Sequence, residues 1–432
     1  MSEAGPSLDI LPIDPISGPL AAAVTVPGSK SLTNRALIIA ALADGETLLT
    51  GALDSDDTRY MVGALERLGF VVFWDHAAAA IRVRGRGGSI PTAGADLFGG
   101  NAGTAVRFLV SLVALGHGRF RIDGDARMRE RPIGGLLAGL AAVGVRAESE
   151  RGDGCPPVVV EADGIRGGFA KVAGATSSQF TSSLLLVAPY AASDMTIEIT
   201  GPLVGAPFVD MTIGLMARTG VAVERSGSTL AVRSGQRYVA GAVAIEPDAT
   251  AASYFLAAPA LLGGSVTVRG LGDDSLQGDV AFIDVLAEMG AEVRRDPGSI
   301  TVRGRELRGV DADFRAISDT FLTGAVLAPF ASTPTRIRGI AHTRRQETDR
   351  VSAVARELAR LGVTVRESED ALEIEPSRPH GGDVETYDDH RIAMSFALMG
   401  LRVPGIRIVN PRCVAKTFPD FFARLESLRP VR

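Results

Sequence analysis

Hydrophobic and polar positions along this chain repeat as one pattern. A polar or charged cluster precedes a helical stretch rich in Ala and Leu, and a short strand of alternating apolar residues follows, ends at a glycine and leads into a second amphipathic helix. The glycine recurs at intervals of about 70 residues, at Gly51, Gly124, Gly201, Gly270 and Gly339. A sixth copy, GIRIVN, ends at Asn410, and asparagine also tolerates a left-handed backbone.

Each second helix ends at a further glycine, as in ALERLG at Gly69 and LARLG at Gly362. Glycine just beyond a periodic apolar stretch is a signal for a helix C-terminus. Two short strands follow in most copies, for example VVFWD and then IRVRG, joined by turns rich in Gly, Asp and Pro. Each unit is therefore predicted to be βαβαββ or a permutation of it, and six such units fill the chain.

A chain of 432 residues exceeds the size at which one hydrophobic core keeps growing. Two domains of three units each are the natural division. We predict a discontinuous domain of residues 1–26 and 246–432 and a continuous domain of residues 27–245. The leading strand AAAVTV, residues 21–26, is expected to join the second half, so the chain would pass between the domains twice.

Composition narrows the class of protein. The formal net charge of −5 is the wrong sign for a partner such as nucleic acid or an acidic membrane surface. Two cysteines, Cys155 and Cys413, are too few for a disulfide framework or a zinc cage and suit a reducing compartment. No apolar stretch reaches membrane-spanning length, and the first 25 residues lack the pattern of a signal peptide. We expect a cytoplasmic enzyme.

Candidate chemistry begins where each first helix begins. The six starts carry Ser29-Lys30-Ser31, Asn101-Ala102-Gly103-Thr104, Ser177-Ser178-Gln179, Asp248-Ala249-Thr250, Ser318-Asp319-Thr320 and Asp388-Asp389-His390-Arg391. Free N–H groups and the positive end of the helix dipole make such starts suitable for anions. Ordinary capping would explain any one cluster. Capping has no need of Lys30, Gln179 or the His390-Arg391 pair. The cations among them oppose the helix dipole.

Further cations gather in the loops after the alternating strands, at Arg127, Arg129, Arg131, Arg344, Arg345, Arg350, Arg412 and Lys416. A net-acidic chain that places cations in equivalent loops is predicted to bind a polyanion, although each loop alone could be a solvated face. Asp319 and Glu347 stand among these cations. They could simply pair with arginine, or they could move protons at tuned pKa values. No metal-ligand spacing, Walker loop or dinucleotide fingerprint is present, so neither metal nor cofactor is expected.

At these residues the chain resembles the 5-enolpyruvylshikimate-3-phosphate synthases, which are 3-phosphoshikimate 1-carboxyvinyltransferases. The likeness covers essentially the whole chain, in family order, through PGSKSLTNRAL, LDSDDTRYM, GNAGTAVRF, RMRERPIG, SSQF, DATAASYFLAA, QETDR, DDHRIAM and KTFPDFF. The resemblance implies the enolpyruvyl transferase fold, an inside-out α/β barrel of two similar domains, each of three βαβαββ repeats, with the active site in the interdomain cleft. It also implies transfer of the enolpyruvyl group of phosphoenolpyruvate to the 5-hydroxyl of shikimate 3-phosphate, with release of phosphate and no metal or cofactor.

The resemblance assigns roles to residues at matching motif positions. Shikimate 3-phosphate would contact Lys30, Ser31, Arg35, Ser177, Ser178, Gln179, Asp319 and Gln346. Phosphoenolpyruvate would contact Lys30, Gly103, Gln179, Arg131, Arg350, Arg391 and Lys416. Asp319, assisted by Lys30, would take the 5-hydroxyl proton, and Glu347 would protonate the methylene carbon. His390 would hydrogen-bond nearby, with its part in proton transfer left open.

Four positions depart from the pattern usual in that family, all on the shikimate 3-phosphate side. Gly205 stands in place of a serine, Phe208 in place of a tyrosine, His342 in place of an asparagine and Gln346 in place of a lysine. We expect a weaker or differently built 3-phosphate pocket, with Arg344 or Arg345 as a substitute cation. Gly103 and Thr104 keep the form that leaves room for the inhibitor glyphosate.

Three alternatives remain at this stage. A UDP-N-acetylglucosamine enolpyruvyl transferase would carry a cysteine in the loop occupied here by GDARMRERPIG, which has none. An RNA 3′-phosphate cyclase would need a basic, aromatic-lined surface. A non-enzymatic anion-binding module would gain nothing from Asp319 and Glu347 among its cations. The partners expected are small anionic substrates, with no nucleic acid and no membrane, and the chain is expected to be a monomer.

Overall fold

The computed structural model of the protein describes residues 9–429, which divide into two compact units. One, here called the discontinuous unit, holds the described residues up to Val26 and those from Pro247 onward. The other, the continuous unit, is Pro27–Glu246. In the described part of the chain no helix is both long enough and apolar enough to cross a membrane.

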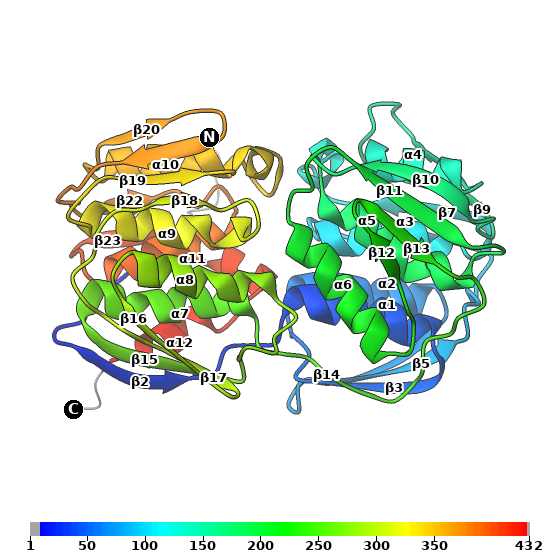
Figure 1. The fold of residues 1–432 in the computed structure, drawn as a ribbon, viewed down its shortest axis with the longest axis horizontal. Coiled ribbons are helices and arrows are strands. Elements are labelled where there is room, and N and C mark those ends of the chain that lie inside the picture. Colours follow the sequence, from blue (N-terminus) through cyan, green and yellow to red (C-terminus); the bar gives the residue numbers. More distant parts are fainter. Residues whose placement is uncertain (1–8, 430–432) are drawn as a thin grey trace, which may run out of the picture. The chain divides into compact units, whose positions relative to one another are not determined.

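The continuous unit contains three successive repeats (Figure 1). The first has α1 (Lys30–Leu42), β3 (Asp44–Thr50), α2 (Asp56–Arg67), β4 (Val71–Asp75) and β5 (Ala80–Arg86). The second has β6 (Gly94–Phe98), α3 (Gly103–Val113), β7 (His117–Asp123), η1 (Met128–Glu130), α4 (Gly134–Ala142), β8 (Arg146–Ser149) and β9 (Val158–Asp163). The third has β10 (Gly168–Ala173), α5 (Ser178–Val187), η2 (Ala188–Tyr190), β11 (Met195–Thr200), α6 (Ala206–Arg218), β12 (Glu224–Ser226) and β13 (Thr229–Val232), and β14 (Ala242–Ala244) follows.

The discontinuous unit opens with β1 (Ile10–Pro12) and β2 (Leu20–Val24). Its first repeat has α7 (Ala249–Leu262), β15 (Gly264–Arg269), η3 (Gly278–Ala281), α8 (Phe282–Glu288), β16 (Glu292–Asp296) and β17 (Ser299–Arg303). The second has β18 (Asp311–Asp313), η4 (Ser318–Thr320), α9 (Phe321–Leu327), η5 (Ala328–Phe330), β19 (Thr335–Arg338), η6 (Ala341–Arg345), α10 (Arg350–Arg360), β20 (Val365–Glu367) and β21 (Ala371–Ile374). The third has β22 (Gly382–Val384), α11 (His390–Gly400), β23 (Ile406–Val409), η7 (Pro411–Lys416) and α12 (Phe421–Glu426).

The described strands form five four-stranded sheets with one common topology and a sixth sheet that differs. In the order β6-β7-β9-β8, the leading strand β6 runs parallel to β7, and β9 pairs antiparallel with both β7 and β8. This topology confirms the predicted βαβαββ repeat. The sixth sheet has the order β1-β23-β22, and β1, which the sequence pattern did not predict, pairs antiparallel with β23.

The leading strands of the two first repeats are exchanged along the chain. Strand β2 precedes α1 in sequence, but it pairs in parallel with β15, Leu20 opposite Gly264. Strand β14 precedes α7 in sequence, but it pairs in parallel with β3, Ala242 opposite Leu48. The predicted strand at residues 21–26 is therefore present, shifted to Leu20–Val24, and it joins the second half as expected.

The first helix of each repeat forms the interior of its unit. Every residue of α3, α9 and α11 is buried, and in α7 only Leu262 is not fully buried. Figure 1 shows these helices inside each unit with the strands along its outside. A helix that is apolar all round can be stable only when it is enclosed, which explains why the Ala- and Leu-rich stretches lack a polar face.

Four of the five strand-closing glycines adopt the predicted left-handed backbone, with φ from 68° at Gly51 to 86° at Gly270, and Asn410 does so at 53°. Gly124 is the exception, because it is absent from the residues with positive φ. A Cβ atom there would lie 2.3 Å from the Gly100 carbonyl oxygen. At this position glycine is required by close packing and not by backbone conformation.

Gly264→Ala is expected to lower the unfolding midpoint more than Gly298→Ala. Both glycines are left-handed, at φ 78° and 72°, so both variants carry a backbone cost of about 1–2 kcal/mol. Only at Gly264 would the new Cβ meet a neighbour, the Leu20 carbonyl oxygen at 2.0 Å, whereas nothing lies within 4 Å at Gly298. Thermal denaturation of both variants measures the difference, and equal midpoints would contradict the close approach of β2 to β15.

Candidate active site

Arg350, the first residue of α10, is the centre of a buried ionic cluster in the discontinuous unit. Its guanidinium is 1% exposed and lies 2.7 Å from Asp389 and 3.0 Å from each of Asp319 and Glu347. Burial alone would lower its pKa, but the three carboxylates reverse that effect and raise the pKa above the ordinary value. Gln346 also accepts a hydrogen bond from this guanidinium.

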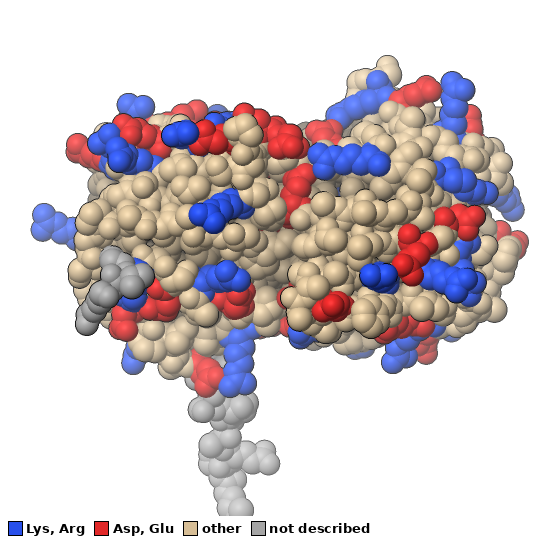
Figure 2. Space-filling view, turned by 90° about the horizontal axis from the view of Figure 1, so that it is seen from below, with Lys and Arg blue, Asp and Glu red and all other residues tan. Residues whose placement is uncertain are grey.

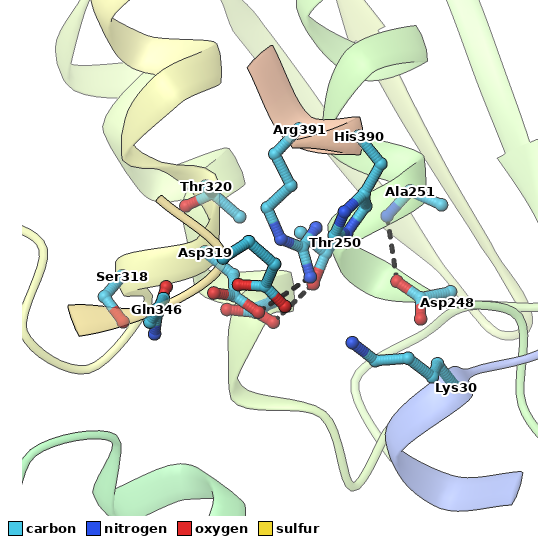
Figure 3. A network of polar contacts seen from close by, with 12 residues as sticks. Lys30, Asp248, Thr250, Ala251, Ser318, Asp319, Thr320, Gln346, His390 and Arg391 are labelled. Carbon is cyan, nitrogen blue, oxygen red and sulfur yellow. Dashed lines mark hydrogen bonds and ion pairs between the residues drawn. The ribbon is translucent and has the colours of Figure 1, made fainter. Parts of the chain in front are cut away.

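Arg391 joins the same cluster from α11. Its guanidinium donates to Asp319 Oδ2 at 2.7 Å, while Asp319 Oδ1 accepts from Arg350. Figure 3 shows the Asp319 and Arg391 side chains pointing toward one another from the starts of α9 and α11. Although burial lowers the pKa of Arg391, nearby carboxylates, Asp319 first, keep it well above the ordinary value. Two guanidinium groups thus bind the two oxygens of one carboxylate.

Glu347 and Lys416 complete the cluster. The Lys416 ammonium lies 3.9 Å from one Glu347 carboxylate oxygen, and Arg350 contacts the other. His390 is fully buried, and its Nδ1 lies 3.6 Å from Asp389 Oδ1. The cluster thus brings together the predicted residues Asp319, Gln346, Glu347, Arg350, His390, Arg391 and Lys416.

Asp279, in η3, is a buried acid that the sequence analysis did not single out. Its Oδ2 accepts a hydrogen bond from Thr250 at 2.6 Å, and its Oδ1 has no hydrogen-bond partner among the described residues. Burial, and then the charge of Asp319, raise the pKa of Asp279 to about 7. A second carboxyl group near Asp319 therefore keeps its proton at mildly acidic pH values at which an ordinary aspartate is ionised. The only sequence signal was an acidic residue in the loop after a strand.

The helix starts divide into two kinds. Ser29, Ser177, Asp248 and Asp389 cap α1, α5, α7 and α11, each accepting from a backbone N–H of the first turn. At α3 the cap residue is Ala102 and no side chain caps the helix, and α9 follows the 3-10 turn that contains Asp319. Capping thus accounts for four starts, but not for Gly103-Thr104 or Asp319.

Lys30, the first residue of α1, lies in the continuous unit. Its ammonium is 3.7 Å from Asp57, a buried acid at the start of α2. Ser31 follows on the same turn, and its carbonyl oxygen accepts from Arg35. Asp57 belongs to the LDSDDTRYM motif, but nothing in that motif connects it with Lys30.

Arg35 is more deeply buried than its predicted contact with substrate suggests. It is 1% exposed and donates to Thr212 Oγ1 at 2.7 Å, Ser182 Oγ at 3.3 Å and two backbone carbonyls. Its guanidinium also lies 5.2 Å from the centre of the Phe108 ring. No described carboxylate forms an ion pair with it, and burial lowers its pKa to about 9. A cation is thus held in the interior by neutral groups alone.

Gln179 connects two helix starts of the continuous unit. Its amide donates to Thr104 Oγ1 at 3.3 Å and accepts from Arg107 at 2.6 Å. Arg107 also donates to the Pro132 carbonyl and lies 5.4 Å from the Phe180 ring centre. Arg107 was not among the predicted site residues, because nothing in one sequence links positions 107 and 179.

Gly103 and Arg131 are close neighbours. A Cβ atom on Gly103 would lie 2.7 Å from an Arg131 guanidinium nitrogen. Arg131 in turn donates to the side chain and the carbonyl of Asn101, at 2.9 and 3.1 Å. The glycine thus leaves the space that the guanidinium occupies.

Local contacts explain some of the four residues that differ from the family pattern. Gly205 is left-handed at φ 59°, a conformation that a serine would adopt only with strain, and its Cβ would approach Ser178 Oγ to 3.1 Å. His342 contacts Ser318 Oγ at 2.9 Å, and burial lowers its pKa. The side chain of Phe208 has no polar group that could replace a tyrosine hydroxyl.

Arg344 was predicted as a substitute for the missing lysine of the 3-phosphate pocket, but its contacts do not favour that role. Arg344 is bound to Asp349 at 3.0 Å and Glu367 at 2.8 Å, and it donates to two backbone carbonyls as well. Local carboxylates thus already neutralise it. Arg345 is exposed and makes no polar contact among the described residues.

Several of the loop cations are surface groups. Arg127 pairs with Glu130 at 2.7 Å, Arg129 pairs with Asp123 at 2.7 Å, and Arg412 pairs with Asp9. For these the simpler interpretation as a solvated face holds. Figure 2 shows Lys and Arg interspersed with Asp and Glu on the face in view. Among residues 9–429 no group of three or more His, Cys, Asp or Glu side chains could hold a metal ion.

Comparison with known proteins gives a consistent result. The sequence model of the EPSP synthase (3-phosphoshikimate 1-carboxyvinyltransferase) family matches residues 15–425. A 3-phosphoshikimate 1-carboxyvinyltransferase of Nostoc punctiforme is 47% identical over 420 residues, 96% of this chain and 98% of the relative. One of Shewanella piezotolerans is 43% identical over 425 residues, 98% and 99% of the two chains.

Solved structures agree. An EPSP synthase from Acinetobacter baumannii is similar with a TM-score of 0.82 and 25% sequence identity, over 97% of this chain and 98% of that one. The enolpyruvyl transferase NikO from Streptomyces tendae has a TM-score of 0.75 at 20% identity, over 98% of each chain, which shows a common fold.

Asp279→Asn is expected to stabilise the protein more at pH 8 than at pH 5. An ordinary aspartate ionises near pH 4, whereas folded Asp279 keeps its proton up to a pKa of about 7. The unfolded chain therefore binds fewer protons between these values, so wild-type stability falls as the pH rises from about 4 to about 7 and stays lower above. Asparagine resembles the protonated acid and does not ionise.

Melting temperatures of the two proteins at pH 5 and pH 8 measure the effect. Asp96→Asn, at an exposed position of β6 without polar contacts, is the control. A difference between variant and wild type that is the same at both pH values would show that Asp279 is ionised in the folded protein.

Proposed function

This chain belongs to the EPSP synthase family and transfers the enolpyruvyl group of phosphoenolpyruvate to the 5-hydroxyl of shikimate 3-phosphate, and we propose how its residues divide that reaction. The observation that supports this proposal is the cluster around Arg350. It holds Asp319 and Glu347, two carboxylates, among three cations. A site that only trapped anions would gain nothing from these carboxylates, whereas a proton-transferring site needs them.

The shikimate 3-phosphate contacts are assigned to Lys30, Ser31, Arg35, Ser177, Ser178, Gln179, Asp319 and Gln346. Support comes from Arg35. A buried guanidinium without a carboxylate partner leaves positive charge in the second turn of α1, beside Ser182 of α5, and an anionic substrate would compensate it. Because Arg35 donates to Thr212 and Ser182, it would act mainly through this charge and by fixing the turn that carries Ser31.

The phosphoenolpyruvate contacts are assigned to Lys30, Gly103, Arg131, Gln179, Arg350, Arg391 and Lys416. Planar guanidinium groups match the oxygen pairs of carboxylate and phosphate. Arg350 and Arg391 are already oriented by Asp389 and Asp319, so little side-chain entropy would be lost on binding.

The reaction would proceed by addition and then elimination. The oxygen of the 5-hydroxyl attacks C2 of phosphoenolpyruvate, Asp319 with Lys30 takes the hydroxyl proton, and Glu347 gives a proton to C3. Phosphate then leaves from the tetrahedral adduct, and its departing oxygen takes up the proton that Asp319 and Lys30 had removed. At the same time C3 returns its proton to Glu347, and the double bond forms again. Two arginines on Asp319 favour its ionised form, which is the form a base requires. His390, fully buried against Asp389, would serve by orienting that acid.

The altered 3-phosphate pocket is proposed to use Arg345. The positive charge of Arg344 is already neutralised by Asp349 and Glu367, so it would contribute little to binding a phosphate. Arg345 is exposed, and Gln346 is bound to Arg350. We further propose that the protein acts in the cytoplasm as a monomer and without nucleic acid. UDP-N-acetylglucosamine as acceptor is the second candidate, but the family match does not favour it.

Asp319→Ala is expected to lower the rate of phosphate release from phosphoenolpyruvate about 100-fold or more, because general-base catalysis contributes about 10²–10⁴-fold. The assay measures inorganic phosphate with shikimate 3-phosphate as acceptor, and UDP-N-acetylglucosamine is run in parallel. Release in the variant at the wild-type rate would remove Asp319 from the mechanism. Release that depends on UDP-N-acetylglucosamine alone would establish the second candidate.

Gly103→Ala is expected to raise the KM for phosphoenolpyruvate about tenfold, since the new methyl group would displace Arg131. The inhibition constant for glyphosate should rise with it, from a sensitive wild type. Gly63→Ala in α2, where nothing lies within 4 Å of the new Cβ, is the matched control and should leave both constants unchanged. An unchanged KM in the Gly103 variant would contradict the assigned site.

A further inference from the structure

A strained turn precedes α11. The Asp389 N–H donates to the Thr386 carbonyl at 2.8 Å, which closes a four-residue turn. Its two central residues, Tyr387 and Asp388, are both left-handed, with φ of 52° and 56°. Turns of this kind normally place glycine or asparagine at the centre. A tyrosine and an aspartate remain in such a conformation only where surrounding contacts hold them.

Tyr387 ties the turn to α10. Its hydroxyl donates to Glu357 Oε1 at 2.7 Å, and the Arg356 guanidinium lies 5.6 Å from its ring centre. Glu357 is fully buried and also accepts from the Glu385 N–H and from Arg360. Burial first, and the hydrogen bond to Glu357 second, raise the pKa of Tyr387, so the hydroxyl keeps the proton that it donates.

The other residues of the turn tie it to the end of β23. Asp388 Oδ1 accepts from the Asn410 side chain at 3.1 Å, and the Thr386 hydroxyl donates to the Val409 carbonyl at 2.9 Å. Asn410 is left-handed as well and directly precedes η7. The contacts of three consecutive residues thus anchor both sides of the turn.

The three elements joined here carry three cations of the active site. Arg350 is the first residue of α10, Arg391 lies in the first turn of α11, and Lys416 ends η7. Asp389, the last residue of the turn, caps α11 and binds Arg350 at 2.7 Å. A shift of the turn would therefore move the cations relative to one another.

We propose that Tyr387 and Asp388 are positioning residues that set the spacing of Arg350, Arg391 and Lys416, and thereby the affinity for phosphoenolpyruvate. This inference rests on the proposed assignment of those three cations to phosphoenolpyruvate. Glycine would relieve the backbone strain at either position, but it would supply neither the hydroxyl for Glu357 nor the carboxylate for Asn410.

Tyr387→Phe removes only the hydroxyl and keeps the ring on Arg356. We expect the KM for phosphoenolpyruvate to rise about tenfold, with a smaller change in the KM for shikimate 3-phosphate, because small displacements of binding groups have large effects. The matched control is Tyr190→Phe in the continuous unit, which loses a hydroxyl bonded to the Leu42 carbonyl at 2.6 Å. It should change the melting temperature without changing either KM.

Asp388 separates positioning from stability, because it is exposed and buries little surface. Asp388→Gly relieves the strain, so the melting temperature should hold or rise while the KM for phosphoenolpyruvate increases. Asp388→Asn keeps an oxygen for Asn410 and tolerates the left-handed backbone, so this variant should keep the wild-type KM for phosphoenolpyruvate.

Arg391→Lys distinguishes the two levels of the argument. If it raises the KM for phosphoenolpyruvate while Tyr387→Phe and Asp388→Gly leave that KM unchanged, the positioning role is wrong and the assigned site stands. If Arg391→Lys itself leaves the KM unchanged, the assignment of the cations fails, and the positioning role fails with it.

Discussion

A guanidinium group that is buried away from water needs neighbouring negative charge. The buried Arg350 imposes this constraint on the discontinuous unit. Removing a charge from water costs several kcal/mol, and only close, well-oriented carboxylates compensate it. Asp319, Glu347 and Asp389 do so from the start of α9, the loop before α10 and the turn before α11. Two of these three carboxylates, Asp319 and Glu347, are also those assigned to the chemistry, so their geometry is set before any substrate arrives.

The continuous unit solves the same problem differently. Arg35 is equally buried, but its hydrogen-bond partners are hydroxyl groups and carbonyls alone, and burial lowers its pKa to about 9. The cations around Arg350 are balanced within the protein, whereas the charge of Arg35 is not.

The repeat was predictable because local signals agree at every copy. Glycines at helix ends and strand ends, polar helix starts and alternating strands are all readable within about ten residues. Lys30, Asp319 and Arg391 could be predicted as site residues for the same reason, because each lies in a polar cluster at a helix start. The inward position of Arg35 and the roles of Asp279 and Arg107 depend on partners far apart in sequence, such as Arg35 and Thr212, which are 177 positions apart. One sequence carries no signal for such pairs, and Gly124 shows that even a regular position can owe its residue to a distant contact.

The exchange of β2 and β14 has a consequence for how the chain is made. Emerging from the ribosome, residues 27–246 contain every strand of their own sheets, because β14 arrives at the end to complete the sheet of β3. Strand β2 emerges long before its partner β15 and must wait, unpaired, through the synthesis of an entire unit. The continuous unit can therefore fold during translation. In the discontinuous unit, by contrast, β2 stays unpaired until residue 269 has been added, and β1 stays unpaired until β23 has been added at residue 409.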